Sequence, residues 1–315
     1  MGGSGGLVHL LTLAVIFVNG WTDAPNAIAT AVGSGALTFR RGVVLAAACN
    51  FAGAALACLC FPAVADTVGE LVAFGDPRSA AAALNAALLS IVLWAVAAWR
   101  FGLPTSESHA LLAGLSGGAL ALGGGLARLN GRAWLMALAG LGLSLPAGVI
   151  AGRLIRRVLT GRLRRPALGQ RWAAALTALL HGVQDGLKFL ALLLLTDGLD
   201  GTEGSSRLAL ALLTAGVMAL GTALGGKPIV EKVGTELASL SPAEGLAADL
   251  GAGAVLLACS ALGLPVSTTH AKVAAVCGAG RGASRTVMGQ MAGAWILTFP
   301  ACGGIAFLLA RIMTR

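Results

Sequence analysis

GLPTSESHA, at residues 102–110, recurs 161 residues later as GLPVSTTHA, at residues 263–271. A second pair of related stretches, NGWTD at 19–23 and HGVQD at 181–185, is displaced by 162 residues. Two motifs in the same order with nearly the same displacement indicate an internal duplication. The sequence therefore predicts two structural repeats that share one architecture.

The composition of the chain is that of a protein dissolved in lipid. Of its 315 residues, 57% are hydrophobic and 11% are charged, and the mean hydropathy is +0.85. This excludes an ordinary soluble enzyme. The 46 glycines favour closely packed helices, because small residues let helix backbones approach in a membrane.

Apolar stretches of near membrane length occur in two sets of five. The first set covers 7–38, 42–64, 79–100, 105–123 and 133–152; the second covers 172–196, 207–224, 243–262, 265–280 and 286–310. We expect an all-α polytopic membrane protein with a first repeat at 1–152, a basic linker at 153–171 and a second repeat at 172–315. Five crossings per repeat would give the second repeat inverted topology.

The positions of the charges support this topology. Residues 153–171 contain seven arginines and no acidic residue, so the positive-inside rule places this linker in the cytoplasm. With the linker inside, 14 basic residues fall inside and six outside, and both termini lie on the external face. The net charge of +9 is thus a topological signal and not a nucleic-acid footprint.

Five ionisable residues lie inside apolar segments, where each costs about 2.5–3.5 kcal/mol on insertion scales. They are Asp23, Glu107, Asp185, Lys188 and Lys272. Because all five lie in or beside the repeated motifs, we expect them to be functional. The alternative is that they form buried ion pairs that only hold helices together.

Each Gly-Leu-Pro sequence predicts a helix that begins partway through the membrane, with Pro104 or Pro265 presetting the helical φ angle. The N–H groups of such a helix end, the helix dipole and nearby hydroxyls suit a small oxyanion. The alternative is simple capping or back-bonding by the hydroxyls. The candidate anion-binding residues are Thr105, Ser106, Ser108, Ser267, Thr268 and Thr269.

Asp23 lies beside Pro25, which interrupts a helix and frees carbonyl groups. Together with Asn26 these oxygens suit a hard cation or a proton. Asp185 is the counterpart of Asp23, and Lys188 stands where the first repeat has Asn26. A permanent ammonium there would take the place of a bound cation.

Three histidines accompany the motifs: His109 and His270 end the nonapeptides, and His181 begins the second aspartate motif. Each is either a packing residue or a handler of protons, since small environmental shifts move imidazole across physiological pH. No histidine-cysteine spacing predicts a zinc site.

These residues resemble the PiT family of inorganic phosphate transporters. Both nonapeptides are similar to its GxPxSxxHA motif, and residues 231–242 are similar to its GxxxTELxP segment. Its GxNDxxNAxxT...GSGALT signature is matched by Gly20, Asp23, Asn26, Ala27, Thr30, Gly33, Ser34, Gly35, Ala36, Leu37 and Thr38. The resemblance implies an inverted-repeat transporter, commonly dimeric, that holds phosphate between facing re-entrant helices.

We therefore expect a secondary transporter, not an enzyme, that imports inorganic phosphate by symport with sodium or a proton. Its coupling residues would be Asp23, Asn26, Asp185 and Glu107, with Lys188 and Lys272 as tethered charges. The only cofactor expected is a bound sodium ion at Asp23, Asn26 and Asp185. The partners are phosphate, the cation, lipid and a second copy of the chain, in a bacterial-type inner (plasma) membrane.

Three alternatives stay open. The same scaffold could carry sulfate or another oxyanion, or the protein could be an anion channel, which conducts without accumulation. An intramembrane enzyme is disfavoured, because the candidate groups are duplicated and do not form one nucleophile-base set.

Overall fold

The computed structural model describes residues 4–159, 161–200 and 206–314, and within these ranges it is helical with no named strand. The first half contains α1 (Ser4–Thr22), α2 (Asn26–Gly33), α3 (Phe39–Cys60), α4 (Pro62–Gly69), α5 (Pro77–Arg100), α6 (Glu107–Ala121), the 3₁₀ helix η1 (Gly125–Arg128) and α7 (Gly131–Leu159). The second contains α8 (Pro166–Asp200), α9 (Arg207–Leu224), α10 (Lys227–Glu231), the π-helical turn η2 (Lys232–Glu236), α11 (Pro242–Ala261), α12 (Thr268–Ala279) and α13 (Arg285–Met313). The all-α class expected from the sequence is confirmed.

Eight helical stretches among the described residues are long and apolar enough to cross a membrane. Two of the ten expected segments, 105–123 and 265–280, are not among them. They correspond to α6 and α12, which have 15 and 12 residues. A spanning helix needs about 20 residues, so neither can cross alone.

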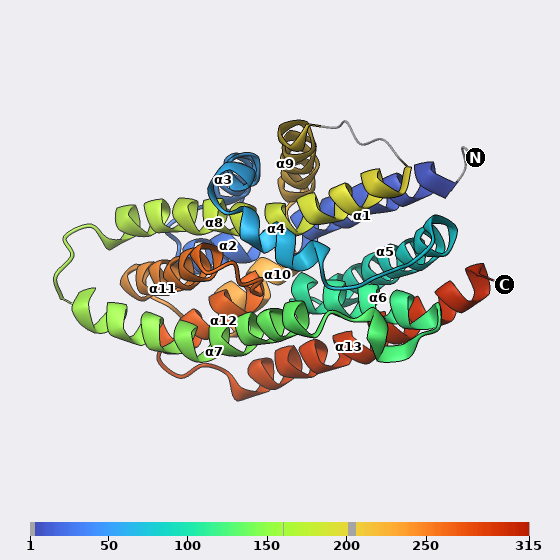
Figure 1. Cartoon of the computed structure of the whole chain (residues 1–315). Coiled ribbons are helices and arrows are strands. Elements are labelled where there is room, and N and C mark those ends of the chain that lie inside the picture. Colours follow the sequence, from blue (N-terminus) through green and yellow to red (C-terminus); the bar gives the residue numbers. More distant parts are fainter. Residues whose placement is uncertain (1–3, 160, 201–205, 315) are drawn as a thin grey trace.

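Figure 1 shows how these two short helices are placed. α6 packs beside α5, and α12 packs beside α11, on opposite sides of the middle of the molecule. The termini lie at one end of the molecule, and the connection between α7 and α8 lies at the other. The inverted relation of the repeats and their limits stay predictions.

The basic segment expected as a linker at 153–171 is largely helical. α7 continues to Leu159 and α8 begins at Pro166, so the connection between the helices is short. Arginine is a good helix former, which is why a charged stretch extends α7 beyond the apolar segment.

Close helix contacts explain the glycine content where α1 crosses α9. A Cβ added to Gly221 would lie 2.1 Å from the Phe17 carbonyl oxygen, and one added to Gly20 would lie 2.1 Å from the Met218 carbonyl oxygen. Glycine at both positions lets the two backbones touch, as expected for helices packed in lipid.

The charged side chains of the apolar segments lie inside the molecule, and many large apolar side chains are exposed on its surface. Phe101, Trp172 and Ile296 are each more than 70% exposed, whereas Asp23, Asp185 and other charged residues of the apolar segments are buried. This distribution suits a lipid-facing exterior around a polar interior.

Candidate functional site

Each Gly-Leu-Pro motif leads to a serine that caps a helix. Ser106 precedes α6 and Ser267 precedes α12, both in extended backbone conformation. Their Oγ atoms accept hydrogen bonds from the backbone N–H groups of His109, at 3.3 Å, and His270, at 3.1 Å. The helices therefore begin three residues after the prolines and not at them, because the serine is the better N-cap.

The tips of the two short helices are hydrogen-bonded to each other. Thr269 Oγ1, in α12, donates to the Thr105 carbonyl at 3.0 Å. Ser108 Oγ, in α6, donates to the Val266 carbonyl, also at 3.0 Å. Ser108 corresponds to Thr269 in the repeated nonapeptide, and Thr105 corresponds to Val266, so the two bonds are equivalent.

Asp23 lies in the break between α1 and α2 and is 4% exposed. Its carboxylate accepts hydrogen bonds from Asn26 Nδ2 at 2.7 Å and from Thr268 Oγ1 at 3.2 Å. It also lies within hydrogen-bonding distance of Thr269 Oγ1, whose single proton is shared between Asp23 and the Thr105 carbonyl. Asn26 Nδ2 also lies 3.2 Å from Thr269 Oγ1, and its buried Oδ1 has no hydrogen-bond partner. Aspartate and hydroxyl oxygens, together with the Asn26 amide nitrogen, thus converge at the tip of α12.

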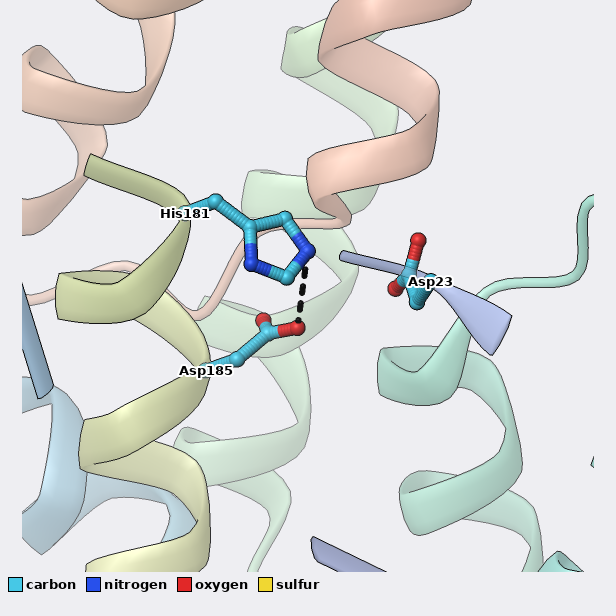
Figure 2. Close-up of side chains that lie close together, drawn as sticks. All are labelled: Asp23, His181 and Asp185. Carbon is cyan, nitrogen blue, oxygen red and sulfur yellow. Dashed lines mark ion pairs between the residues drawn. The ribbon is translucent and has the colours of Figure 1, made fainter. Parts of the chain in front are cut away.

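Asp185 is fully buried on α8 and faces Asp23. Its Oδ2 accepts a hydrogen bond from Asn19 Nδ2 at 3.0 Å and lies 3.4 Å from His181 Nε2. Figure 2 shows the His181 ring beside the Asp185 carboxylate, with the Asp23 carboxylate to one side of both. One oxygen of each carboxylate and one ring nitrogen lie within 4.8 Å of one another. These residues, all predicted from sequence, share one site.

Lys188 completes this site from the α8 side and is 1% exposed. Its Nζ donates to Asp185 Oδ1 at 2.7 Å, to Ser108 Oγ at 2.8 Å and to the Val266 carbonyl at 2.6 Å. A lysine ammonium has three protons, so its hydrogen-bonding capacity is fully used.

We call the residues joined by these contacts the central cluster. Its members are Asp23, Asn26, Thr105, Ser108, Asp185, Lys188, Val266, Thr268 and Thr269.

Lys272, the other buried lysine, lies outside the central cluster. Its Nζ pairs with Asp249 on α11 and donates to Thr30 Oγ1 and the Ala27 carbonyl, both at 3.0 Å. Thr30 Oγ1 also donates to Asp249. Asp249 was missed by sequence reasoning; the available signal was a carboxylate inside the apolar segment 243–262.

Glu107 is 3% exposed at the start of α6, and its Oε2 is buried without a hydrogen-bond partner. It lies within electrostatic range of Asp23, Asp185 and Lys188. The carboxyl group thus lies near the central cluster, and its Oε2 takes no part in the hydrogen bonds of the cluster.

His109 and His270 lie next to each other, with ring centroids 4.7 Å apart. The His109 ring also contacts Phe299 at 4.8 Å, and the His270 ring contacts Trp295 at 4.1 Å. Among the described residues neither ring forms an ion pair with a carboxylate. Of the three candidate histidines, only His181 lies beside the carboxylates.

The chemistry available at the tips is that of two facing helix N-termini. Because the serine caps use the third N–H, the N–H groups of Glu107, Ser108, Thr268 and Thr269 have no intrahelical acceptor. These donors and the positive ends of the helix dipoles favour an anion. The carboxylates beside them favour a cation, so the site can hold both charges.

Known proteins resemble this chain in sequence and in fold. The probable low-affinity inorganic phosphate transporter of Bacillus subtilis is 30% identical over 98% of this chain and 97% of its own length. A protein of Rhizobium meliloti with the same description is 34% identical over 96% and 95%. A solved structure, "The sodium-dependent phosphate transporter", superposes with a TM-score of 0.86 over 99% of both chains at 20% identity, which shows the shared fold.

The family model described as the phosphate transporter family matches residues 19–166 and 164–306. These two matches cover nearly all of the chain and contain every residue of the central cluster. The resemblance found in the sequence motifs is therefore confirmed: the chain is an integral membrane protein that belongs to the phosphate transporter family.

Proposed function

We propose that this protein imports inorganic phosphate by symport with a cation, through alternating access. The observation that carries the proposal is the meeting of two capped helix N-termini with two buried carboxylates in one cluster. The names of its relatives, which are transporters and permeases of phosphate, agree with transport and not with an enzyme.

Phosphate binds between the tips of α6 and α12 in this proposal. The free N–H groups and the dipoles of both helices replace water around the anion, and the hydroxyls of Thr105, Ser106, Ser108, Ser267, Thr268 and Thr269 supply further donors. Ser108 and Thr269 now donate to carbonyls across the tips. Phosphate binding would turn these two hydroxyls toward the anion. The direct hydrogen bonds between the tips would then be replaced by hydrogen bonds from both tips to phosphate.

The coupling cation binds on the Asp23 side of the cluster. A hard cation such as sodium prefers oxygen ligands. Asp23 and Thr269 Oγ1 provide them, and the Asn26 amide, whose Nδ2 now contacts these two residues, would turn over to present its oxygen to the cation. The unpartnered Asn26 Oδ1 supports this assignment, because a buried amide oxygen without a donor is costly unless a ligand satisfies it.

Protons provide the other form of coupling. Glu107 has an unpartnered buried carboxyl oxygen, and His181 contacts Asp185, so these two residues are the candidates for proton transfer. Comparing sodium and proton gradients decides between them and the Asp23 cation site.

The way the tips meet supports alternating access. Each tip belongs to a different helical hairpin, α5–α6 or α11–α12, and the hydrogen bonds between the tips lie where the hairpins meet. Separation of one hairpin from the central cluster would open the site to one side of the membrane, and separation of the other would open it to the opposite side.

The placement in the cell completes the proposal. We place the chain in a bacterial-type inner membrane with both termini external and the α7–α8 connection in the cytoplasm, on the positive-inside rule. A homodimer is expected from the family resemblance alone.

The test is uptake of ³²P-labelled phosphate into proteoliposomes, with inward sodium and proton gradients imposed separately. We expect accumulation that follows one of the gradients. Uptake that ignores both gradients would refute cation coupling, and conductance without accumulation would identify a channel. Competition by unlabelled phosphate but not by equal sulfate distinguishes a phosphate transporter from a general oxyanion permease.

A further inference from the structure

The duplicated motifs allow the two sides of the central cluster to be compared position by position. Asp23 and Asn26 of the first repeat correspond to Asp185 and Lys188 of the second. On the helix tips, Thr269 corresponds to Ser108, and the Thr105 carbonyl corresponds to the Val266 carbonyl. Each aspartate therefore has an equivalent set of oxygen atoms around it, to which both repeats contribute.

The contacts follow this correspondence. On the first side, Asn26 Nδ2 donates to Asp23, three residues earlier, and lies 3.2 Å from Thr269 Oγ1. Thr269 Oγ1 in turn lies 3.0 Å from the Thr105 carbonyl oxygen. The contacts thus link the Asn26 amide, the Asp23 carboxylate, the Thr269 hydroxyl and the Thr105 carbonyl in one set.

On the second side the donor is an ammonium. Lys188 Nζ donates to Asp185, three residues earlier, and to Ser108 Oγ, and Ser108 Oγ lies 3.0 Å from the Val266 carbonyl oxygen. Lys188 Nζ reaches this carbonyl as well, at 2.6 Å. A single positive centre thus contacts carboxylate, hydroxyl and carbonyl oxygen at once, the oxygen types that bind a hard cation.

The charge balance of the two sides differs accordingly. The carboxylate of Asp185 is neutralised by an ammonium within the same protein. Asp23 has no lysine or arginine within ion-pair distance among the described residues. An unpaired buried carboxylate is costly, so a cation from solution would stabilise the first side, whereas the second side already holds a positive charge in the ammonium of Lys188.

We infer that Lys188 is a built-in cation that fills the second of two repeat-related cation sites, so that each transported phosphate is accompanied by one fewer bound cation. The inference rests on the proposed cation-coupled transport. Its consequence is that the residue three positions after each aspartate sets the coupling ratio, with asparagine admitting a cation and lysine replacing one.

The test uses the full-length protein in proteoliposomes and counts cations per phosphate. Fluxes of ²²Na and ³²P are measured together under a fixed membrane potential, for the wild type, for Lys188→Asn and for Lys188→Arg. Lys188→Asn gives the second side the residue that the first side has. Lys188→Arg keeps the positive charge and is the matched control. If the first experiment identifies protons as the driving ion, a trapped pH dye replaces ²²Na.

The ratio of cation to phosphate should rise by one in Lys188→Asn and stay unchanged in Lys188→Arg. The Hill coefficient for the cation should rise from about 1 to about 2, because it is limited by the number of sites. An unchanged ratio in an active Lys188→Asn variant would overturn the inference but leave cation-coupled transport intact. Absence of gradient-driven uptake in the wild type would instead defeat the proposed function.

A reciprocal variant covers the case in which Lys188→Asn does not fold. Asn26→Lys places an ammonium on the first side. Sodium is expected to raise the thermal stability of the purified wild type, and the purified variant should lose this rise. Retention of the full rise in Asn26→Lys would overturn the inference, because the first site would then still accept a cation.

Discussion

The ion pair between Lys272 and Asp249 gives a stability prediction with a defined magnitude. Both side chains are at most 2% exposed, and Thr30 Oγ1 joins them. Removing one partner of a buried ion pair costs about 3–5 kcal/mol, because the other charge is left uncompensated. Asp249→Leu should therefore destabilise the protein by about this amount. At roughly 2 °C per kcal/mol for a large domain, the unfolding temperature should fall by at least about 6 °C.

The repeat-related positions form an apolar version of the site of Thr30, Asp249 and Lys272. The residues equivalent to Thr30, Asp249 and Lys272 are leucines, and all three are buried in one apolar cluster. These leucines are Leu192, Leu88 and Leu111. The same architecture is thus packed without charge in the other half of the molecule.

This comparison predicts a rescue. The double variant Asp249→Leu/Lys272→Leu should be more stable than either single variant, with an interaction energy of about 2–3 kcal/mol. It still leaves the Thr30 hydroxyl without its partner, at a cost of about 1–3 kcal/mol. Adding Thr30→Leu should recover part of that loss and reproduce the three leucines of the repeat-related site.

The assay is thermal unfolding in detergent, read with a thiol-reactive dye that reports exposure of Cys259 and Cys302, which are buried. The exposed ion pair Lys227–Glu231 provides the control, since Lys227→Leu should change stability by less than about 1 kcal/mol. Equal unfolding temperatures of Asp249→Leu and wild type, or purely additive losses in the double variant, would refute the reasoning.

Three further outcomes are expected. Asp23→Asn should abolish the sodium dependence of phosphate uptake, measured as initial rate against sodium concentration. Gly221→Ala should lower the unfolding temperature because its Cβ would collide with an α1 carbonyl, whereas Gly216→Ala on the same helix meets nothing within 4 Å and should not. The backbone and side chain of Ser79 hold the pKa of the Asp76 carboxyl below its ordinary value of 3.8. Its ionised form therefore stabilises α5 at higher pH and is lost as the pH falls through the lowered pKa, and Asp76→Asn should weaken this acid dependence in unfolding scans.

The sequence predicted the helix tips because their information is local. A proline, a hydroxyl run and a histidine in a fixed order specify an extended approach and an N-cap, and both copies fold that way. Composition predicted the all-helical membrane class for the same reason, since hydropathy is a property of each segment alone. At these two tips only the first helical residue was misplaced. Proline and serine both favour a helix start, and the structure uses serine as the N-cap.

The partners of the buried charges could not be predicted in the same way. Lys188 finds Asp185 three residues away on one helix, so its partner was visible in the sequence. Lys272 finds Asp249 on a different helix and Thr30 in the other repeat, and those distances depend on tertiary packing. Asp249 lies away from the duplicated motifs, and its counterpart in the first repeat is a leucine, so the repeats do not mark it.

That leucine indicates where the two halves of the molecule have diverged. Both buried lysines belong to the second repeat, and each donates a hydrogen bond to a first-repeat oxygen, Lys188 to Ser108 and Lys272 to Thr30. A charge-assisted hydrogen bond contributes about 1.5–3 kcal/mol, so these contacts tie the repeats together at two separate places. The duplication preserves the backbone, and the substitutions place fixed positive charge on one side only. The cation from solution is therefore expected on the other side, at Asp23, where the protein supplies oxygen ligands but no ammonium.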